Sequence, residues 1–413
     1  PHTNPPGHQP PLPRQMTTNP TRRRRLRLAG ACAMTLALAA GAIALPAAPA
    51  HAADPITAAD QSYFAYYKLD QARAKGYTGK GVTIALLDGE VDTSAPELAG
   101  ATIIDKTPCT VTSSNESKTH GTLVASLLGS SQYGVAPDAS ILTYRSLSAS
   151  EGDSAGSDCY GDSSSSKHSI ASLLNHAMND GASVISVAQA VPDESRALKW
   201  AIARSMHENV VIVSSMGNER RDQNITHLSR FSGVVGVSAI DLNGKLADYS
   251  SWGQGVTTTA FGGPVTVRNY VDNQIGQTSG TSISAPLTAG FITLAKQKWP
   301  NATSNQLLQL LTHTARTDQD GWNIYTGFGR VDPGALVNTD PSQYPDENPI
   351  ADKGGGSSPT AEEVQEYADG VVAPTELAFD DSYTYRGLDE SVVRDTDITV
   401  PIHLGTSPRY HAK

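Results

Sequence analysis

Residues 82–89, VTIALLDG, form a continuous run of apolar and β-branched residues that ends in an acid followed by a glycine. Such a run, without alternating polar residues, is typical of a strand buried on both faces of a parallel sheet. Further apolar runs lie at residues 184–187, 210–213 and 234–240, and amphipathic helical patterns at 170–181, 194–208 and 282–299. This alternation predicts an α/β fold in which helices cover both faces of a doubly wound, mostly parallel sheet.

Asp88 ends the first of these strands, and His120 and Ser282 each stand at the start of an apolar helix. His120 opens the string HGTLVASLL at residues 120–128, and Ser282 lies in GTSISAP at residues 280–286. Taken singly, Asp88 is best explained as a turn residue, His120 as a packed or surface residue and Ser282 as a helix cap. Taken together, they supply what nucleophilic hydrolysis needs: a nucleophile, a base and a carboxylate that holds the base.

A fourth polar residue, Asn218, follows the strand at residues 210–213 in the string SSMGN. Its carboxamide could donate a hydrogen bond to an oxyanion, together with the backbone N–H of Ser282 at the positive end of its helix. Gly-Asn is also a common turn dipeptide, and this is the simpler explanation for Asn218 when it is considered alone.

The order Asp88, His120, Ser282 and the strings around them resemble the subtilases, the subtilisin-like serine peptidases of family S8. The resemblance covers about residues 75–337 and includes GVAP at 134–137 and TGFGRV at 326–331. It implies a subtilisin-like α/β fold and a secreted endopeptidase that hydrolyses peptide bonds through an acyl-enzyme. In that mechanism His120 deprotonates Ser282, and Asp88 orients His120. Asn218 and the Ser282 N–H would bind the oxyanion.

The string after Asp88 departs from the family pattern. Subtilases usually follow this acid with Thr or Ser and then Gly, whereas Gly89 and Glu90 follow it here. A second carboxylate near the triad favours the protonated form of His120 and raises its pKa. The sequence therefore predicts an activity optimum shifted to higher pH.

The strand expected to pair with an extended substrate carries Ala188, Gln189 and Ala190, where the family commonly has Ser-x-Gly. Backbone pairing with a peptide tolerates this change. The methyl group of Ala190 should nevertheless fill space that a glycine leaves open. These three are the expected substrate-binding residues, and they predict a narrow pocket that prefers small side chains.

The N-terminal region predicts a secretory signal peptide. Residues 1–15 hold six prolines and are treated as upstream or non-native sequence, so that Met16 is the expected start. Residues 16–52 combine a basic run, an Ala- and Gly-rich apolar stretch at 28–45 and the small-x-small cleavage site AHA at 50–52. An uncleaved membrane anchor is the alternative. We expect a secreted protein whose mature chain has no membrane span.

Loss of residues 1–52 removes six of the 31 cationic residues and none of the 41 acids, which moves the formal charge from −10 to −16. Such an acidic chain is not expected to bind nucleic acid or anionic membrane surfaces. Two cysteines, Cys109 and Cys159, remain, and an even number in an exported protein favours a disulfide over two free thiols. No cofactor is expected to be required and no metal ligands are assigned; calcium, at a site the sequence does not identify, is the one ion considered.

The chain is expected to divide into an N-terminal extension (53–78), a catalytic domain (79–337), a Pro- and Gly-rich linker (338–360) and an acidic C-terminal tail (361–413). An extension of about 25 residues is too short for the inhibitory prodomain of many subtilases. In this it resembles the mycosins, subtilases of type VII secretion that end in a membrane helix. That resemblance implies a type VII secretion partner besides a protein or peptide substrate.

Two other functions compete with the peptidase. A catalytically idle subtilase domain that binds peptides is suggested by the altered string after Asp88, although the intact His120 and Ser282 favour activity. An α/β-hydrolase is disfavoured, because in that fold the nucleophile precedes its acid and histidine and lies in a Gly-x-Ser-x-Gly elbow.

Overall fold

The structure is a computed structural model that describes residues 55–148, 150–160, 166–189, 194–222, 227–319, 321–354 and 358–387, and the backbone of residues 403 and 404. The described residues all belong to one compact unit. The expected signal peptide at 16–52, residues 1–15 and Ala190 lie outside the described residues.

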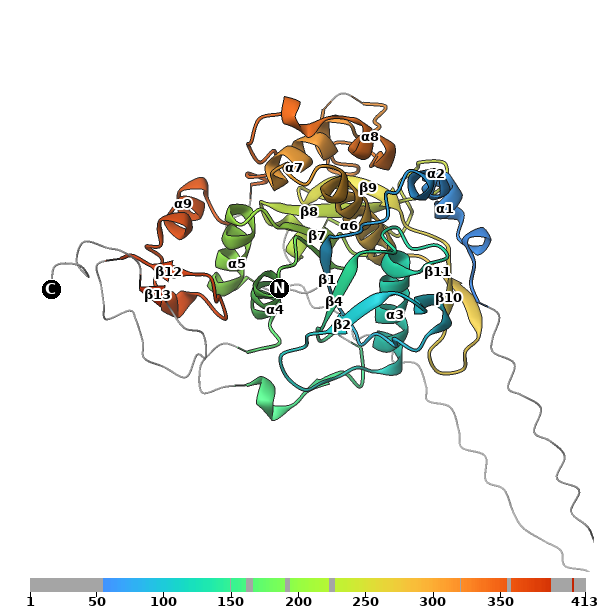
Figure 1. The fold of residues 1–413 in the computed structure, drawn as a ribbon, viewed down its shortest axis with the longest axis horizontal. Coiled ribbons are helices and arrows are strands. Elements are labelled where there is room, and N and C mark those ends of the chain that lie inside the picture. The colour runs from blue at the N-terminus through green and yellow to red at the C-terminus, as the bar shows by residue number, and fades with distance from the viewer. Residues whose placement is uncertain are drawn as a thin grey trace, which may run out of the picture. The chain divides into compact units, whose positions relative to one another are not determined.

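A seven-stranded parallel sheet forms the centre of the fold, in the order β2-β4-β1-β6-β7-β8-β9 (Figure 1). Its strands are β1 (Thr83–Asp88), β2 (Thr102–Asp105), β4 (Ser140–Arg145), β6 (Val184–Val187), β7 (Val211–Ser215), β8 (Val234–Ile240) and β9 (Val256–Phe261). The chain builds one side of the sheet from β1 through β2 and β4 and then crosses to β6 and the other side. Open α/β sheets place their ligand sites at such a crossing, outside the carboxyl ends of the strands.

Helices cover both faces of the sheet (Figure 1). One hydrophobic core includes side chains of α3 (Asn115–Gly129) and α6 (Thr281–Lys298), and a second includes α4 (Ile170–Asn179) and α5 (Arg196–His207). Strand β1 contributes to both, since Ile84 and Leu86 lie in the first core and Ala85 and Leu87 in the second. All four are fully buried, which explains why the strand has no polar alternation. The predicted fold class is confirmed.

The remaining elements surround this body. They are α1 (Ser62–Tyr66), α2 (Leu69–Ala74), α7 (Ser304–His313), α8 (Pro333–Asn338), α9 (Ala361–Asp369) and the strand pairs β3 (Val111–Thr112) with β5 (Ser154–Ala155), β10 (Val265–Arg268) with β11 (Ile275–Thr278), and β12 (Thr384–Tyr385) with β13 (His403–Leu404). The N-terminal extension packs closely, since Tyr63 is fully buried and its hydroxyl donates to the Tyr133 carbonyl at 3.0 Å. No described helix is both long and apolar enough to cross a membrane.

The described part of the expected linker and acidic tail packs on the domain instead of extending from it. Tyr367 of α9 shares a small hydrophobic core with Trp200 of α5. Two acids of the tail pair with cations on α5. Glu363 pairs with Lys199, and Asp380 pairs with Arg204 at 3.1 Å; the side chains of Asp380 and Arg204 are each 2% exposed. Composition could not show this packing, because each of these two acids pairs with a cation more than 150 residues away in the chain.

Candidate active site

Asp88 lies at the carboxyl end of β1, and its side chain is fully buried beside the crossing from β1 to β6. Its Oδ1 atom is 2.8 Å from His120 Nδ1, and it accepts from the Gly89 N–H at 2.7 Å and from Gln189 Nε2 at 3.4 Å. The second oxygen, Oδ2, is buried without a hydrogen-bond partner among the described residues. Since a buried carboxylate is costly unless donors reach it, these contacts fix Asp88 in one orientation towards His120.

Helix α3 brings His120 to Asp88 because two glycines allow a close approach. Ser114 caps the N-terminus of the helix, since its hydroxyl accepts from the backbone N–H of Ser117. A Cβ on Gly121 would lie 2.5 Å from the Gly89 carbonyl oxygen, and a Cβ on Gly89 would lie 2.2 Å from the Ser117 carbonyl oxygen. Either contact is too short for a real side chain, so a larger residue at either position would push α3 away from β1.

The environment of His120 favours its charged form. Burial on its own would lower the pKa of the imidazole, but the negative charge of Asp88 and the hydrogen bond to it act in the opposite direction, and the carboxylate of Glu116 adds to them. The net result is a pKa above the ordinary value for histidine. One edge of the ring remains accessible, since 31% of the side chain is exposed.

Glu90, which the sequence suggested as the source of this effect, is engaged elsewhere. Its carboxylate contacts Lys118 Nζ at 3.0 Å and Arg145 Nη1 at 3.0 Å, and Arg145 also binds Asp105. The two cations offset its charge. The direction of the expected shift therefore agrees with the structure, whereas the carboxylate beyond Asp88 that contributes to it is Glu116.

Glu116→Gln should move the acid limb of the activity profile to lower pH. The raised pKa of His120 holds the ring protonated to a higher pH, and a general base must be neutral to act, so removing a negative charge near it lowers that pKa. The pH dependence of kcat/KM for a peptide substrate measures the shift. Glu90→Gln is the matched control and should move the limb less; a larger shift in Glu90→Gln would contradict this assignment.

Ser282 lies in the first turn of α6, and Asn218 follows β7. Asn218 Oδ1 accepts from the Thr281 backbone N–H at 2.8 Å and from the Thr281 hydroxyl at 3.1 Å, and that hydroxyl accepts from the Gly217 N–H at 3.0 Å. The carboxamide oxygen is thus fixed towards Thr281, and its NH₂ group faces away. A Cβ on Gly280 would lie 3.1 Å from both Asn218 Nδ2 and Ser282 Oγ, so these two atoms border the same small space.

The four expected residues thus form two pairs: Asp88 contacts His120, and Asn218 borders the same space as Ser282. Within the described part of the chain no hydrogen bond joins Ser282 Oγ to His120. Hydrogen bonds between a nucleophile and its base often tighten only around the substrate.

Of the three residues expected to bind substrate, the structure describes Ala188 and Gln189, which directly follow β6. Ala188 is 3% exposed and packs into the hydrophobic core, and the Gln189 side chain donates to the Asp88 carboxylate. The Gln189 amide is held by Ser146, whose hydroxyl donates to Oε1 at 2.7 Å. Ala190 lies outside the described residues, so the narrow pocket remains a prediction.

The sequence did not predict two contacts at this site, Gln189 with Asp88 and Thr281 with Asn218, nor the effect of the Glu116 charge on His120. The sequence did hold one signal for the position of Gln189 near Asp88. Ser146 and Gln189 both follow strands that flank β1, and the ends of neighbouring parallel strands meet at one edge of the sheet. Thr281 stands between Gly280 and Ser282, yet its link to Asn218 joins residues 63 positions apart.

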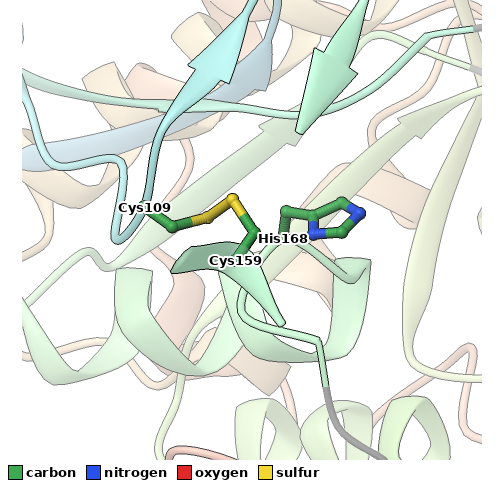
Figure 2. Close-up of side chains that lie close together, drawn as sticks. All are labelled: Cys109, Cys159 and His168. Carbon is green, nitrogen blue, oxygen red and sulfur yellow. A yellow bond between two sulfur atoms is a disulfide. The ribbon is translucent and has the colours of Figure 1, made fainter. Parts of the chain in front are cut away.

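Cys109 and Cys159 are joined by a disulfide, with Cα atoms 5.0 Å apart, and His168 lies beside them (Figure 2). Within the described residues these three form the one group of His, Cys, Asp or Glu side chains whose ligand atoms lie close enough together to hold a metal ion. Each sulfur is bonded to the other, so neither is a free thiolate, and His168 Nδ1 contacts the Ser166 hydroxyl. The arrangement is that of a structural disulfide.

Comparisons with known proteins show the family and the fold. The sequence profile of the Subtilase family matches residues 79–329. A thermostable alkaline protease of Halalkalibacterium halodurans is 30% identical over 258 residues, 60% of this chain and 66% of that protein, so the chain spans just under two thirds of that relative's length. Subtilisin Savinase of Lederbergia lenta is 31% identical over 269 residues, 63% of this chain and 92% of the relative.

Solved structures give the same result for the fold. MycP1 from the ESX-1 type VII secretion system superimposes with a TM-score of 0.58 at 24% identity, over 72% of this chain and 91% of that one. MycP1 with its N-terminal propeptide removed superimposes with a TM-score of 0.53 at 26% identity, over 69% of this chain and 98% of that one.

Proposed function

The chain belongs to the subtilase family, and from that membership we propose that it is a serine endopeptidase with Asp88, His120 and Ser282 as its catalytic triad. The observation that carries the proposal is the 2.8 Å contact between a fully buried carboxylate, Asp88 Oδ1, and His120 Nδ1 at the crossing point of the sheet. In a nucleophilic hydrolase with such a pair, the histidine is the general base and the buried aspartate orients it.

Asp88 selects the tautomer of His120. Its Oδ1 atom is an acceptor held in place by the Gly89 N–H, so His120 carries its proton on Nδ1 and leaves Nε2 free to accept one. When Nε2 takes a proton, the imidazolium is stabilised by the adjacent carboxylate, in agreement with the raised pKa of His120.

The reaction then proceeds in two halves. Ser282 Oγ attacks the peptide carbonyl carbon while its proton passes to His120 Nε2, and the carbonyl oxygen becomes an oxyanion. The C–N bond breaks, the amine leaves with the proton from His120, and an acyl-enzyme on Ser282 remains. Water attacks the acyl carbon with His120 again taking the proton, and the ester bond breaks to return that proton to Ser282.

Asn218 and the backbone N–H of Ser282 would stabilise the oxyanion. The Asn218 NH₂ group is free for this because Thr281 occupies its oxygen, and its nitrogen borders the same space as Ser282 Oγ. A donor fixed in advance needs no reorganisation when charge develops on the carbonyl oxygen.

Asn218→Ala should therefore lower kcat by about 10²- to 10³-fold, the loss known for the equivalent change in subtilisin, with little change in KM. Steady-state hydrolysis of one chromogenic peptide by both proteins measures it. Thr281→Val is an informative companion: it removes the hydroxyl but keeps the backbone donor, so its loss should be smaller. An unchanged kcat in Asn218→Ala would remove Asn218 from the mechanism.

A cleavage experiment separates the peptidase from an idle peptide-binding domain. The protein and its Ser282→Ala variant are each incubated with a denatured protein substrate, and new peptide termini are identified by mass spectrometry. The peptidase predicts cleavage by the first protein only. Binding of peptide without cleavage by either protein would support the idle domain.

Substrate choice and location extend the same proposal. We expect small side chains next to the cleaved bond because of Ala190, and equal cleavage after large aromatic and small residues would contradict this.

Residues 16–52 support export by a signal peptide. An association with type VII secretion is supported by the likeness to MycP1, and co-purification with the components of such a system tests it.

A further inference from the structure

A pocket of about 260 Å³ lies between the N-terminal extension and the catalytic domain. Helices α1 and α2 of the extension form one wall, and α6, α8 and the residues just before α8 form the other (Figure 1). We call it the extension pocket; the lining residues that matter here are Tyr66, Lys68, Lys75, Leu294, Arg316 and Asp332.

The extension pocket is separate from the candidate active site, although one helix reaches both. Helix α6 carries Ser282 in its first turn and Leu294 twelve positions later. At 1.5 Å per residue, the two positions lie about 18 Å apart along the helix axis. A ligand in the extension pocket would therefore not occupy the space in front of Ser282.

The lining carries an excess of positive charge, although the chain as a whole is acidic. Four lining residues are cations and one is an acid, whereas the chain has 31 cationic residues and 41 acids. The five are Lys68, Lys75, Arg316, Arg330 and Asp332. A concave site lined by one sign of charge attracts ligands of the opposite sign, so the pocket favours an anion.

The acid in the lining is already engaged, and the cations are less so. Asp332 Oδ2 accepts from Arg316 Nε at 2.7 Å, and Oδ1 accepts from the Ala335 N–H at 3.1 Å, where it caps α8. Lys68 and Lys75 form no ion pair with any residue that the structure describes, and the Arg316 Nη atoms form no hydrogen bond with one. These donors can form charge-assisted hydrogen bonds with a carboxylate.

The rest of the lining suits an apolar body. Tyr66 is 37% exposed, and its ring meets that of Tyr67 edge-on with the centroids 4.8 Å apart. Leu294 and Val337 add aliphatic surface. An aromatic ligand gains from such rings beyond the area that it buries. Ligand pockets usually enclose about 300–1,000 Å³, so this smaller one favours a small molecule over an extended peptide.

We propose that the extension pocket is a binding site for a small organic acid, in which a carboxylate is carried on an aromatic or aliphatic body. Lys68, Lys75 and Arg316 bind the carboxylate, and Tyr66 and Leu294 contact the body. The N-terminal extension thereby supplies one wall of a site that the catalytic domain does not form by itself. Binding at this site does not depend on peptidase activity.

Calorimetric titration of the full chain with phenylacetate tests the proposal. We expect saturable binding, and binding about tenfold weaker or less for acetate, which lacks the apolar body, and for phenylacetamide, which lacks the charge. Added NaCl should weaken the binding of phenylacetate, because salt screens exposed charges. Equal affinity for phenylacetate and its amide, or no saturable binding of phenylacetate, would overturn the proposal.

A charge reversal locates the bound acid. Lys75 is exposed and follows the last residue of α2, and Lys75→Glu should weaken the binding of phenylacetate by about tenfold. Lys80→Glu makes the same change in net charge at an exposed lysine outside the pocket, and it should leave the affinity unchanged. Thermal unfolding checks that both variants are folded. Equal affinities in the two variants would mean that phenylacetate binds elsewhere, contrary to the proposal.

Competition with a peptide tests the size of the ligand. The tripeptide acetyl-Ala-Ala-Phe carries an aromatic side chain beside a free carboxylate, and it should displace phenylacetate no better than phenylacetate itself binds. Displacement at much lower concentration, lost in Lys75→Glu, would assign the pocket to peptide C-termini and overturn the small-molecule assignment.

Discussion

Ser282→Ala is expected to lower kcat for peptide hydrolysis by about 10⁶-fold, a magnitude known from subtilisin. The variant retains Asp88, His120 and Asn218 but has no atom to form the acyl-enzyme, so only binding and oxyanion stabilisation remain. Single-turnover hydrolysis with enzyme in excess measures the residual rate. Ser279→Ala, at an exposed serine three residues earlier, is the matched control and should leave kcat near its starting value.

The members of a triad act as one unit, which sharpens this expectation. Adding His120→Ala to Ser282→Ala should cause almost no further loss, because a base has no function without its nucleophile. Multiplicative losses in the double variant would mean that Ser282 and His120 act independently, contrary to the proposed mechanism.

Asp88→Asn is expected to lower kcat by about 10⁴-fold at neutral pH without unfolding the protein. One oxygen, Asp88 Oδ1, faces both the Gly89 N–H and His120 Nδ1, so an asparagine that turns its NH₂ group to His120 gives up the contact with Gly89 and makes Nδ1 an acceptor. The ring proton moves to Nε2, the atom that must accept a proton from Ser282. The wrong tautomer, and not a loss of packing, causes the defect.

Rates for Asp88→Asn are best compared with those for Glu90→Gln, which removes a carboxylate two positions away that is paired with Lys118 and Arg145. Thermal unfolding of both variants checks that each is folded. A loss of less than about tenfold in Asp88→Asn would mean that the buried Asp–His contact does not orient the base.

The sequence predicted the elements that local pattern determines. Strand β1 follows from its unbroken apolar run, and α6 ends at Lys298 because Pro300 follows. The position of Asp88 at the sheet edge follows from the same strand, since the carboxyl end of a central parallel strand faces the ligand crevice. Resemblance to a family supplied the roles of His120, Ser282 and Asn218, which each have a simpler explanation when considered alone.

What the sequence could not predict depends on contacts between distant segments. The side chain of Gln189 reaches Asp88 across 101 positions, and its orientation is set by Ser146. The described part of the acidic tail packs on α5, where Asp380 pairs with Arg204, and composition cannot reveal such a pairing.

The central claim is that Ser282 is a nucleophile activated by the Asp88–His120 pair, and a fluorophosphonate probe tests it most directly. Such a probe bonds covalently to an activated serine and to few others. We predict that the protein is labelled at Ser282, as located by peptide mass spectrometry, that Asp88→Asn is labelled far more slowly, and that Ser282→Ala is not labelled. No labelling of the folded, unaltered protein, or labelling that persists in Ser282→Ala, would contradict the account.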